Sequence, residues 1–294
     1  MAKQYRTVSG TIFDGFNYVL LGLLAAASFL PFVYILAGSF ASDAEITQRP
    51  VFFIPETFTL NAYEFIFSSN TIVRSVGVSV YVTVMGTMIN LLFTVTMAYA
   101  LARRTLYGRN LVLNLVVFSI LFSGGMIPTY LVVRELQLLD TYWALVLPGA
   151  ISAFNLIIVK NFFQELPREL EEAAHIDGCT ELGLLWRIAL PLSKPVLATF
   201  ALFYAVGHWN DFFQALLYMN DPAKWPLQVM LRQIVLLSQA AAGDPSAMDP
   251  NFVTPPEQSI KMAVIVVGTI PIMCVYPFLQ KHFAKGVLIG SIKG

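Results

Sequence analysis

Side chains that catalyse reactions are few and widely separated in this sequence. The chain has three histidines, His175, His208 and His282, and its two cysteines lack the spacing of metal ligands. It contains neither an HExxH motif nor a phosphate-binding loop, GxxxxGK followed by Ser or Thr. The sequence therefore predicts no catalytic residue, no metal site and no cofactor bound by this chain. An intramembrane enzyme has little support, and any ATP chemistry must come from another chain.

Polar residues in one long apolar stretch are spaced for binding. Asp211 is the one acidic residue inside the apolar runs that are expected to span the membrane. His208 lies three residues before it and Gln214 three residues after it, so the three are expected to share a helix face. Polar groups beside aromatic rings suit a sugar, which forms hydrogen bonds through its hydroxyls and stacks on rings. The alternative is hydrogen bonding between helices without substrate contact. The substrate-path candidates are Asn155, His208, Trp209, Asn210, Asp211 and Gln214.

The elements that must position these residues are membrane-spanning helices. The chain is 57% hydrophobic and 12% charged, and its mean hydropathy is +0.68. A helix needs roughly 20 mostly apolar residues to cross the hydrocarbon core. Apolar runs of about this length predict an all-α membrane protein with six transmembrane helices in a single domain, 1–294. The runs are 15–42, 75–102, 110–133, 141–159, 195–220 and 262–280.

The distribution of basic residues predicts the orientation of the chain. With six spans and a cytoplasmic N-terminus, 12 of the 18 Lys and Arg residues fall in inner segments and 6 in outer segments. Positive residues are enriched in cytoplasmic loops. Both termini are therefore expected in the cytoplasm, together with the segment of about 165–195.

The segment 165–195 is a long charged stretch between two apolar blocks. Pro167 suits the first turn of a helix, and acidic residues follow it where the helix dipole favours them. Gly178 is predicted to end this helix in a left-handed conformation, Thr180 to cap a second helix and Pro191 to stop it. A helix lying on the lipid surface is the alternative, but such helices usually carry Lys and Arg, whereas this one is acidic.

The same segment resembles the cytoplasmic EAA motif of ABC importer permeases. That pattern is EAA, two residues, DG, nine residues, Ile, one residue, Leu-Pro, and it fits without a gap. The matching positions are Glu172, Ala173, Ala174, Asp177, Gly178, Ile188, Leu190 and Pro191. WNDFFQAL at 209–216 resembles a further family stretch. The chain is similar to carbohydrate-uptake permeases of the maltose-type superfamily, and within them to the alginate-type permeases for oligosaccharides and polysaccharides.

The resemblance implies a type I ABC importer permease fold with a cytoplasmic coupling helix. Glu172 to Gly178 would seat in a groove of a separate ATPase, Leu184, Leu185 and Trp186 would add apolar contact, and Pro191 would lead to the fifth span. The implied partners are a second, different permease, two ATPase subunits that hold ATP and Mg, and an extracytoplasmic sugar-binding protein. Membrane lipid surrounds the spans of this multi-pass protein of the cytoplasmic (inner) membrane, and no nucleic acid is expected.

Two questions stay open at the level of sequence. An ion-gradient-driven secondary transporter is the alternative function; it would show paired charges or broken helices near the midplane and usually an internal repeat, and none of these is visible in the sequence. The outer loop, about 221–259, is either a solvated connector or, by resemblance, a loop that reaches into the sugar-binding protein. Neither the sugar nor its contact with this chain can be read from the sequence.

Overall fold

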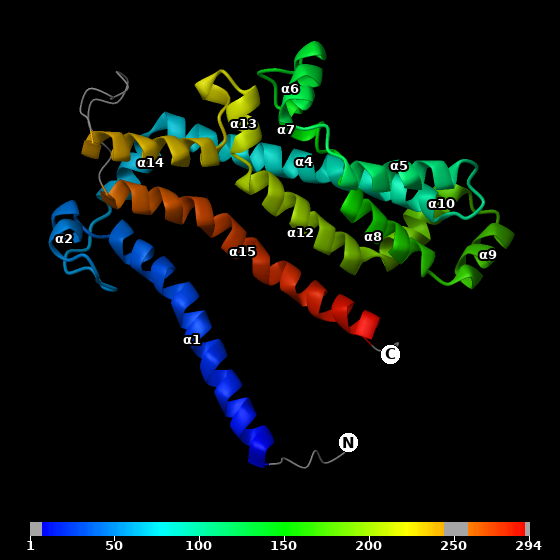
Figure 1. Ribbon diagram of the computed structural model, residues 1–294, viewed down its shortest axis with the longest axis horizontal. Coiled ribbons are helices and arrows are strands. Elements are labelled where there is room, and N and C mark those ends of the chain that lie inside the picture. Colours follow the sequence, from blue (N-terminus) through cyan, green and yellow to red (C-terminus); the bar gives the residue numbers. More distant parts are fainter. Residues whose placement is uncertain (1–7, 244–257, 292–294) are drawn as a thin grey trace. The chain divides into compact units, whose positions relative to one another are not determined.

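The computed structural model describes residues 8–243 and 258–291, and every regular element in this part of the chain is a helix (Figure 1). The described residues divide into two compact units. The first unit draws on Met1–Ser69 and Gln233–Thr269, and the second on Asn70–Arg232 and Ile270–Gly294. The single domain expected over 1–294 stays a prediction.

The first unit contains α1 (Val8–Ser39), α2 (Asp43–Gln48) and α3 (Asn61–Ser68). Its small core joins the end of α1 to α2 through Ala37, Ala41 and Ile46. No residue in the most apolar window of α1 is buried, so this helix depends on lipid or another chain to cover it.

The carboxylate of Glu45 organises the loop that follows α2. It accepts the backbone N–H groups of Glu56 at 2.8 Å and Thr57 at 3.3 Å, and Arg49 pairs with it at 3.4 Å. These N–H donors, that of Glu56 first, hold the pKa of Glu45 below its usual value. An acidic side chain thus fixes this loop, in which Phe52 is buried while Val51, Phe53 and Ile54 stay exposed.

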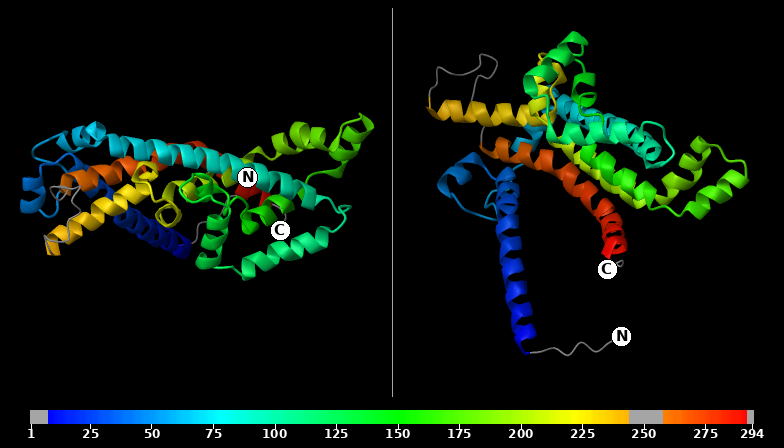
Figure 2. Two further views of the ribbon diagram at one scale, coloured as in Figure 1. Left: turned by 90° about the horizontal axis from the view of Figure 1, so that it is seen from above. Right: turned by 45° about the vertical axis from the view of Figure 1, so that its right-hand side comes forward.

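The second unit is built around the long helix α4 (Asn70–Ala102), against which α8 (Ala153–Gln164) and α12 (Lys194–Asn210) pack. Figure 2 shows α9 (Arg168–Ile176) and α10 (Glu181–Leu184) beyond the C-terminal end of α4. The other elements are α5 (Arg109–Leu121), α6 (Met126–Glu135), α7 (Trp143–Val146), η1 (Leu185–Ala189), α11 (Leu190–Leu192), α13 (Phe213–Tyr218) and η2 (Pro222–Lys224).

Two helices contribute residues to both units. They are α14 (Leu227–Gly243) and α15 (Gln258–Ser291). The first turn of α14 is anchored on α4, because the Leu227 N–H donates to the Ser79 hydroxyl at 2.8 Å. The expected outer loop, about 221–259, contains helix α14, and residues 244–257 of that loop lie outside the described residues.

The expected spans differ from the observed helices mainly in the middle of the chain. Three described helices are long and apolar enough to cross a membrane: Ile12–Ser39, Asn70–Ala102 and Gln258–Val275. Two further pairs of apolar helices are bent at a short break, and counting each pair as one span gives up to five spans. The third expected span breaks between α5 and α6, which are bent by 119°. Gly125 makes this possible with φ +84°, a region open to glycine.

The fourth expected span, 141–159, is not one continuous helix. It is divided between α7 and α8, which has 12 residues and is shorter than a span requires. Pro148 and Gly149 lie between them, and Ser152 starts α8 by accepting the Asn155 N–H at 3.4 Å. Hydropathy alone could not place this interruption, because the residues on both sides of it are apolar.

Candidate functional site

The predicted turn of the EAA segment is present, and its hydrogen bonds explain it. Helix α9 begins after Pro167, and Gly178 follows it with φ +74°. The Cys179 N–H donates to the Ala174 carbonyl at 2.9 Å, and the Gly178 N–H donates to the His175 carbonyl at 3.0 Å. This is the Schellman arrangement, which satisfies the free carbonyls at a helix end and favours glycine at the left-handed position.

The second arm starts as predicted but does not stop where predicted. Thr180 caps α10 by accepting the Gly183 N–H at 3.2 Å. The helix then widens into the π-turn η1 and continues through Pro191 to Leu192, so the prediction that Pro191 stops it is wrong. Pro191 lies in the first turn of α11, where its missing N–H costs little. The chain turns at Ser193, and the residues before and after it are bent by 83°.

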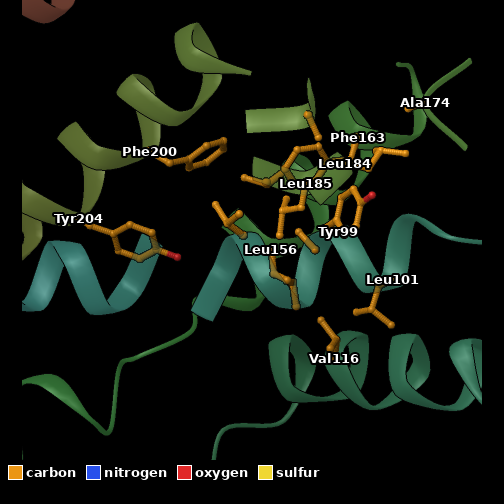
Figure 3. Packing of buried hydrophobic residues seen from close by; sticks show 14 residues of the cluster. Tyr99, Leu101, Val116, Leu156, Phe163, Ala174, Leu184, Leu185, Phe200 and Tyr204 are labelled. Carbon is orange, nitrogen blue, oxygen red and sulfur yellow. The ribbon is translucent and has the colours of Figure 1, made fainter. Parts of the chain in front are cut away.

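The segment has one buried face and one exposed face. Ala174, Leu184 and Leu185 lie in a core with Tyr99 of α4 and Phe163 of α8 (Figure 3). Leu184 and Leu185 are 1% and 3% exposed, so their apolar contacts lie within this core, and their part in coupling to an ATPase stays a prediction. Among the predicted coupling residues, those with exposed side chains or backbone are Glu172, Ala173, Asp177, Gly178, Trp186 and Pro191, whereas Ile188 and Leu190 are half-buried.

Two exposed apolar side chains were not singled out from the sequence. Ile176 is 86% exposed and Leu182 is 70% exposed, and they flank the Gly178 turn. Trp186, at 60% exposed, follows on the second arm. Isolated exposed apolar residues are ordinary, but three on one short polar segment form apolar surface that is available to a partner protein.

Arg103, directly after α4, contacts both arms of the segment. Its guanidinium donates to Glu171 of α9, to Glu181 of α10 at 3.1 Å, and to the Tyr99 hydroxyl. The guanidinium carbon lies 4.7 Å from the centre of the Tyr99 ring. From the sequence, Arg103 is only one of several inner basic residues, since nothing in the local pattern distinguishes it from Arg104.

His208 forms a contact between helices. Its Nε2 lies 2.6 Å from Asn90 Oδ1 of α4, and Asn90 Nδ2 donates to the Gly149 carbonyl at 2.7 Å. One turn along both helices, the hydroxyls of Thr94 and Tyr204 lie 2.7 Å apart. These bonds are what the helix–helix alternative predicts, and a substrate role for His208 stays a prediction.

The other substrate-path candidates are separated by their surroundings. Asp211 accepts the Gln214 N–H at 3.1 Å between α12 and α13, and Asn210 is exposed while its amide donates to the Val206 carbonyl at 2.9 Å. Trp209 is 5% exposed and lines an apolar cavity of about 180 Å³, so its ring is not an open stacking surface.

Gln214 and Asn155 complete the set of candidates. Gln214 Oε1 is buried without a hydrogen-bond partner among the described residues, and Asn155 is buried on α8. A buried carbonyl oxygen that accepts no hydrogen bond is costly, so Gln214 is the candidate that most needs a further donor. Among residues 8–243 and 258–291, no group of three or more His, Cys, Asp and Glu could hold a metal ion.

Comparisons with known proteins agree over nearly the whole chain. The family model described as "Binding-protein-dependent transport system inner membrane component" matches residues 10–289. Protein LplC of Bacillus subtilis (strain 168) is 65% identical, with 99% of this chain and 98% of that protein covered. The polygalacturonan/rhamnogalacturonan transport system permease protein YtcP of the same strain is 56% identical, with 96% and 99% covered.

A solved structure is similar in fold as well. A chain in the crystal structure of a bacterial ABC transporter involved in the import of the acidic polysaccharide alginate superposes with a TM-score of 0.86. The two chains are 33% identical, and the match covers 96% of this chain and 100% of the other. The similarity extends across both compact units.

Proposed function

We propose a mechanism for this chain from one premise: it belongs to the family of binding-protein-dependent transport system inner membrane components. It is a multi-pass inner-membrane protein with a type I permease fold, and it is the membrane-spanning permease of an ABC importer for an oligosaccharide. Family membership decides against the alternative of a transporter driven by an ion gradient.

In the proposed complex, this chain pairs with a second, different permease. Two ATPase subunits bind ATP and Mg²⁺ on the cytoplasmic side, because this sequence has no phosphate-binding loop. A sugar-binding protein delivers substrate from the outer side, and both termini of this chain are cytoplasmic. The permease binds no cofactor of its own and supplies the path and its gating.

The observation that carries this proposal is the exposed turn at Gly178 between two arms that pack on α4 and α8. Its tip presents the carboxylates of Glu172 and Asp177 and the apolar side chain of Ile176 to solvent. A charged and apolar tip on a fixed turn suits insertion into a groove of a partner protein. Closure of the ATPase pair would move the arms and, with them, the helices on which they pack.

We assign acidic oligosaccharides as the substrate class. The support lies in the relatives: YtcP is named for polygalacturonan and rhamnogalacturonan, and the solved transporter imports alginate. All three are polymers that contain uronic acids. In this chain, Gln214 is the substrate contact we favour, because its buried oxygen accepts no hydrogen bond among the described residues and a sugar hydroxyl is a donor.

A pull-down in gentle detergent tests the complex. The N-terminus carries the tag, the C-terminal tail is left free, and the recovered proteins are identified. Recovery of an ATPase with a phosphate-binding loop and a second permease supports the proposal, while recovery of this chain alone contradicts it. The complex is then reconstituted with its binding protein, and ATP hydrolysis is measured with oligogalacturonate and with a neutral oligosaccharide of equal length. Equal or greater stimulation by the neutral sugar contradicts the substrate class.

A further inference from the structure

We infer that Arg103 is the positioning residue that locks both arms of the coupling segment to the end of α4, so that a displacement of the segment moves α4 with it. Throughout, the coupling segment means residues 165–195. The inference rests on the proposed function, since it assigns a task to one residue of the same mechanism.

The contacts of Arg103 join three elements through one side chain. One terminal nitrogen donates to Glu171 of α9, and the other donates to Glu181 of α10 and to the hydroxyl of Tyr99. A guanidinium has donors in a fixed planar fork, so it can hold two carboxylates at once in a defined direction. A lysine ammonium in this place could approach the same oxygens but would not fix the angle between the two arms.

Partial burial makes the Arg103–Glu171 pair stronger than the Arg103–Glu181 pair. The side chains of Arg103 and Glu171 are 21% and 26% exposed, whereas that of Glu181 is 60% exposed. Exposed ion pairs contribute little because water screens them, and the screening falls as the pair becomes buried. Tyr99 adds two further contacts: its hydroxyl donates to Glu181 at 3.3 Å, and its ring packs edge-on against Phe163.

Several ionisable groups surround this site. They are Glu171 and Glu181 from the two arms, Tyr99 and Arg103 at the end of α4, and His175, whose Nε2 lies 3.4 Å from Glu181. Within the described ranges, Arg103 is the permanent cation in direct contact with both carboxylates. Its removal would leave these two acidic side chains without their shared partner.

The apolar core beneath the arms does a different job. Ala174, Leu184 and Leu185 pack with Tyr99 and Phe163, and this burial holds the segment against α4 and α8. Apolar contact has little directionality, so it tolerates sliding and small rotations, whereas the hydrogen bonds of Arg103 do not. The core therefore attaches the coupling segment to α4 and α8, and Arg103 fixes the orientation of the segment on α4.

From α4 a displacement has a route to α12. The helices are joined by the Asn90–His208 and Thr94–Tyr204 hydrogen bonds, one turn apart. The coupling segment also reaches α12 directly, through the bend at Ser193 and through the apolar core that it shares with Phe200 and Tyr204. Without Arg103, the direct connection of the coupling segment to α12 remains. The connection through α4 is weakened, because the angle between the segment and α4 is no longer fixed.

The test uses the reconstituted complex with Arg103→Met, Arg103→Lys and, as a matched control, Arg104→Met, which removes the same charge from the exposed neighbour. Three quantities are measured: the ATPase subunit that copurifies, ATP hydrolysis stimulated by loaded binding protein, and substrate transported per ATP. We expect Arg103→Met to retain the ATPase subunit and to lose on the order of tenfold in transport per ATP, with a smaller loss for Arg103→Lys. Arg104→Met should match the wild type.

Several outcomes would overturn the inference. One is transport per ATP by Arg103→Met equal to that of Arg104→Met. Another is loss of the ATPase subunit in proportion to transport, which would make Arg103 a support of the docking surface. If Arg103→Met does not accumulate, the isosteric pair Glu171→Gln with Glu181→Gln takes its place under the same criteria. Failure of both to accumulate, with normal amounts of Arg104→Met, would assign Arg103 to folding and also overturn the inference.

The wild-type complex separates this result from the proposed function. A wild-type chain that recovers no ATPase subunit, or transports no oligosaccharide, contradicts the proposed function whatever Arg103 does. A working wild-type complex with a normal Arg103→Met variant contradicts only the role of Arg103.

Discussion

Gly86 of α4 lies directly against the His208 side chain of α12. A Cβ atom at this position would stand 2.5 Å from His208 Nε2 and 2.7 Å from two carbons of the same ring. Since Asn90 Oδ1 is held by that nitrogen at 2.6 Å, displacement of the ring would also leave a buried amide oxygen without its donor. Glycine is therefore required here for a close approach, not for its backbone freedom.

Gly86→Ala should destabilise the purified protein by roughly 1–3 kcal/mol, the usual cost of extra volume in a packed interface. Thermal unfolding in detergent measures this. Gly77→Ala on the same helix is the control, because its Cβ would enter open space. Adding His208→Ala to Gly86→Ala should recover part of the loss by making room, while the Asn90 bond stays lost. A melting temperature of Gly86→Ala equal to that of Gly77→Ala would contradict this account.

Asp140 connects two loops of the second unit. Its Oδ1 accepts the N–H groups of Asp221 at 3.1 Å and Asn220 at 3.2 Å, and Lys224 Nζ lies 3.5 Å from its other oxygen. The Asp221 N–H, then the Lys224 charge, lower the pKa of this carboxyl in the folded protein. Its stabilising effect is therefore complete above the unfolded pKa, about 4, and is lost as the pH falls through the lower folded value.

Asp140→Asn is the matching substitution, because asparagine tolerates the φ of +61° at this position. We expect a melting temperature lower than that of the wild type by a few degrees at pH 7. Below about pH 4 the wild type should lose this advantage progressively, and the two melting temperatures should converge once the pH falls below the lowered folded pKa, because the carboxylate is then protonated. Melting curves measured from pH 7 down to the most acidic pH at which the protein still folds test this; a difference that stays constant over that range would show that the charge is irrelevant.

At the scale of elements, the two arms of the coupling segment depend on the turn between them. Gly178 has φ +74°, and a Cβ there would meet no neighbouring atom, so a substitution is penalised by the backbone alone. A left-handed conformation costs other residues roughly 1–2 kcal/mol, and β-branched residues more, whereas Asn adopts it readily.

Gly178→Val should therefore uncouple the importer, with ATP hydrolysis continuing while transport falls several-fold. Gly178→Asn keeps the left-handed conformation and should transport nearly as well as the wild type. The comparison requires transport and ATP hydrolysis in the same vesicles. Normal coupling in Gly178→Val would refute the role of the turn, and equal damage in Gly178→Asn would point to side-chain size instead of backbone strain.

Local chemistry explains which elements could be predicted from the sequence. Gly178 and Thr180 act within a few residues of themselves, so the first helix, the turn and the start of the second arm follow from their types. The prediction for Pro191 is wrong because a π-turn upstream moves this residue into the first turn of a new helix. The breaks inside the third and fourth expected spans could not be predicted in full, because apolar residues continue on both sides of them.

At the scale of the whole molecule, the pairs that the structure brings together were beyond prediction. Arg103 meets Glu171 across 68 positions of sequence, and His208 meets Asn90 across 118. Nothing near either residue specifies its partner, because the pairing depends on how α4 packs with the other helices. The buried environment of Leu184 and Leu185 has the same origin.

The 12 to 6 division of basic residues predicts the membrane orientation of the whole chain, and this prediction can be checked chemically. Cys179 and Cys274 are first replaced by alanine, and single cysteines are introduced at two exposed positions, Asp177→Cys in the coupling segment and Val51→Cys in the loop after α2. A membrane-impermeant maleimide that reaches the outer face of the cytoplasmic membrane, but does not cross that membrane, should label Val51→Cys. In cells that lack the ATPase subunits, which would otherwise cover this position, Asp177→Cys should react only after the cytoplasmic membrane is opened, because the coupling segment is inside. Labelling of Asp177→Cys in intact cells would invert the orientation and, with it, the assignment of this segment to an ATPase.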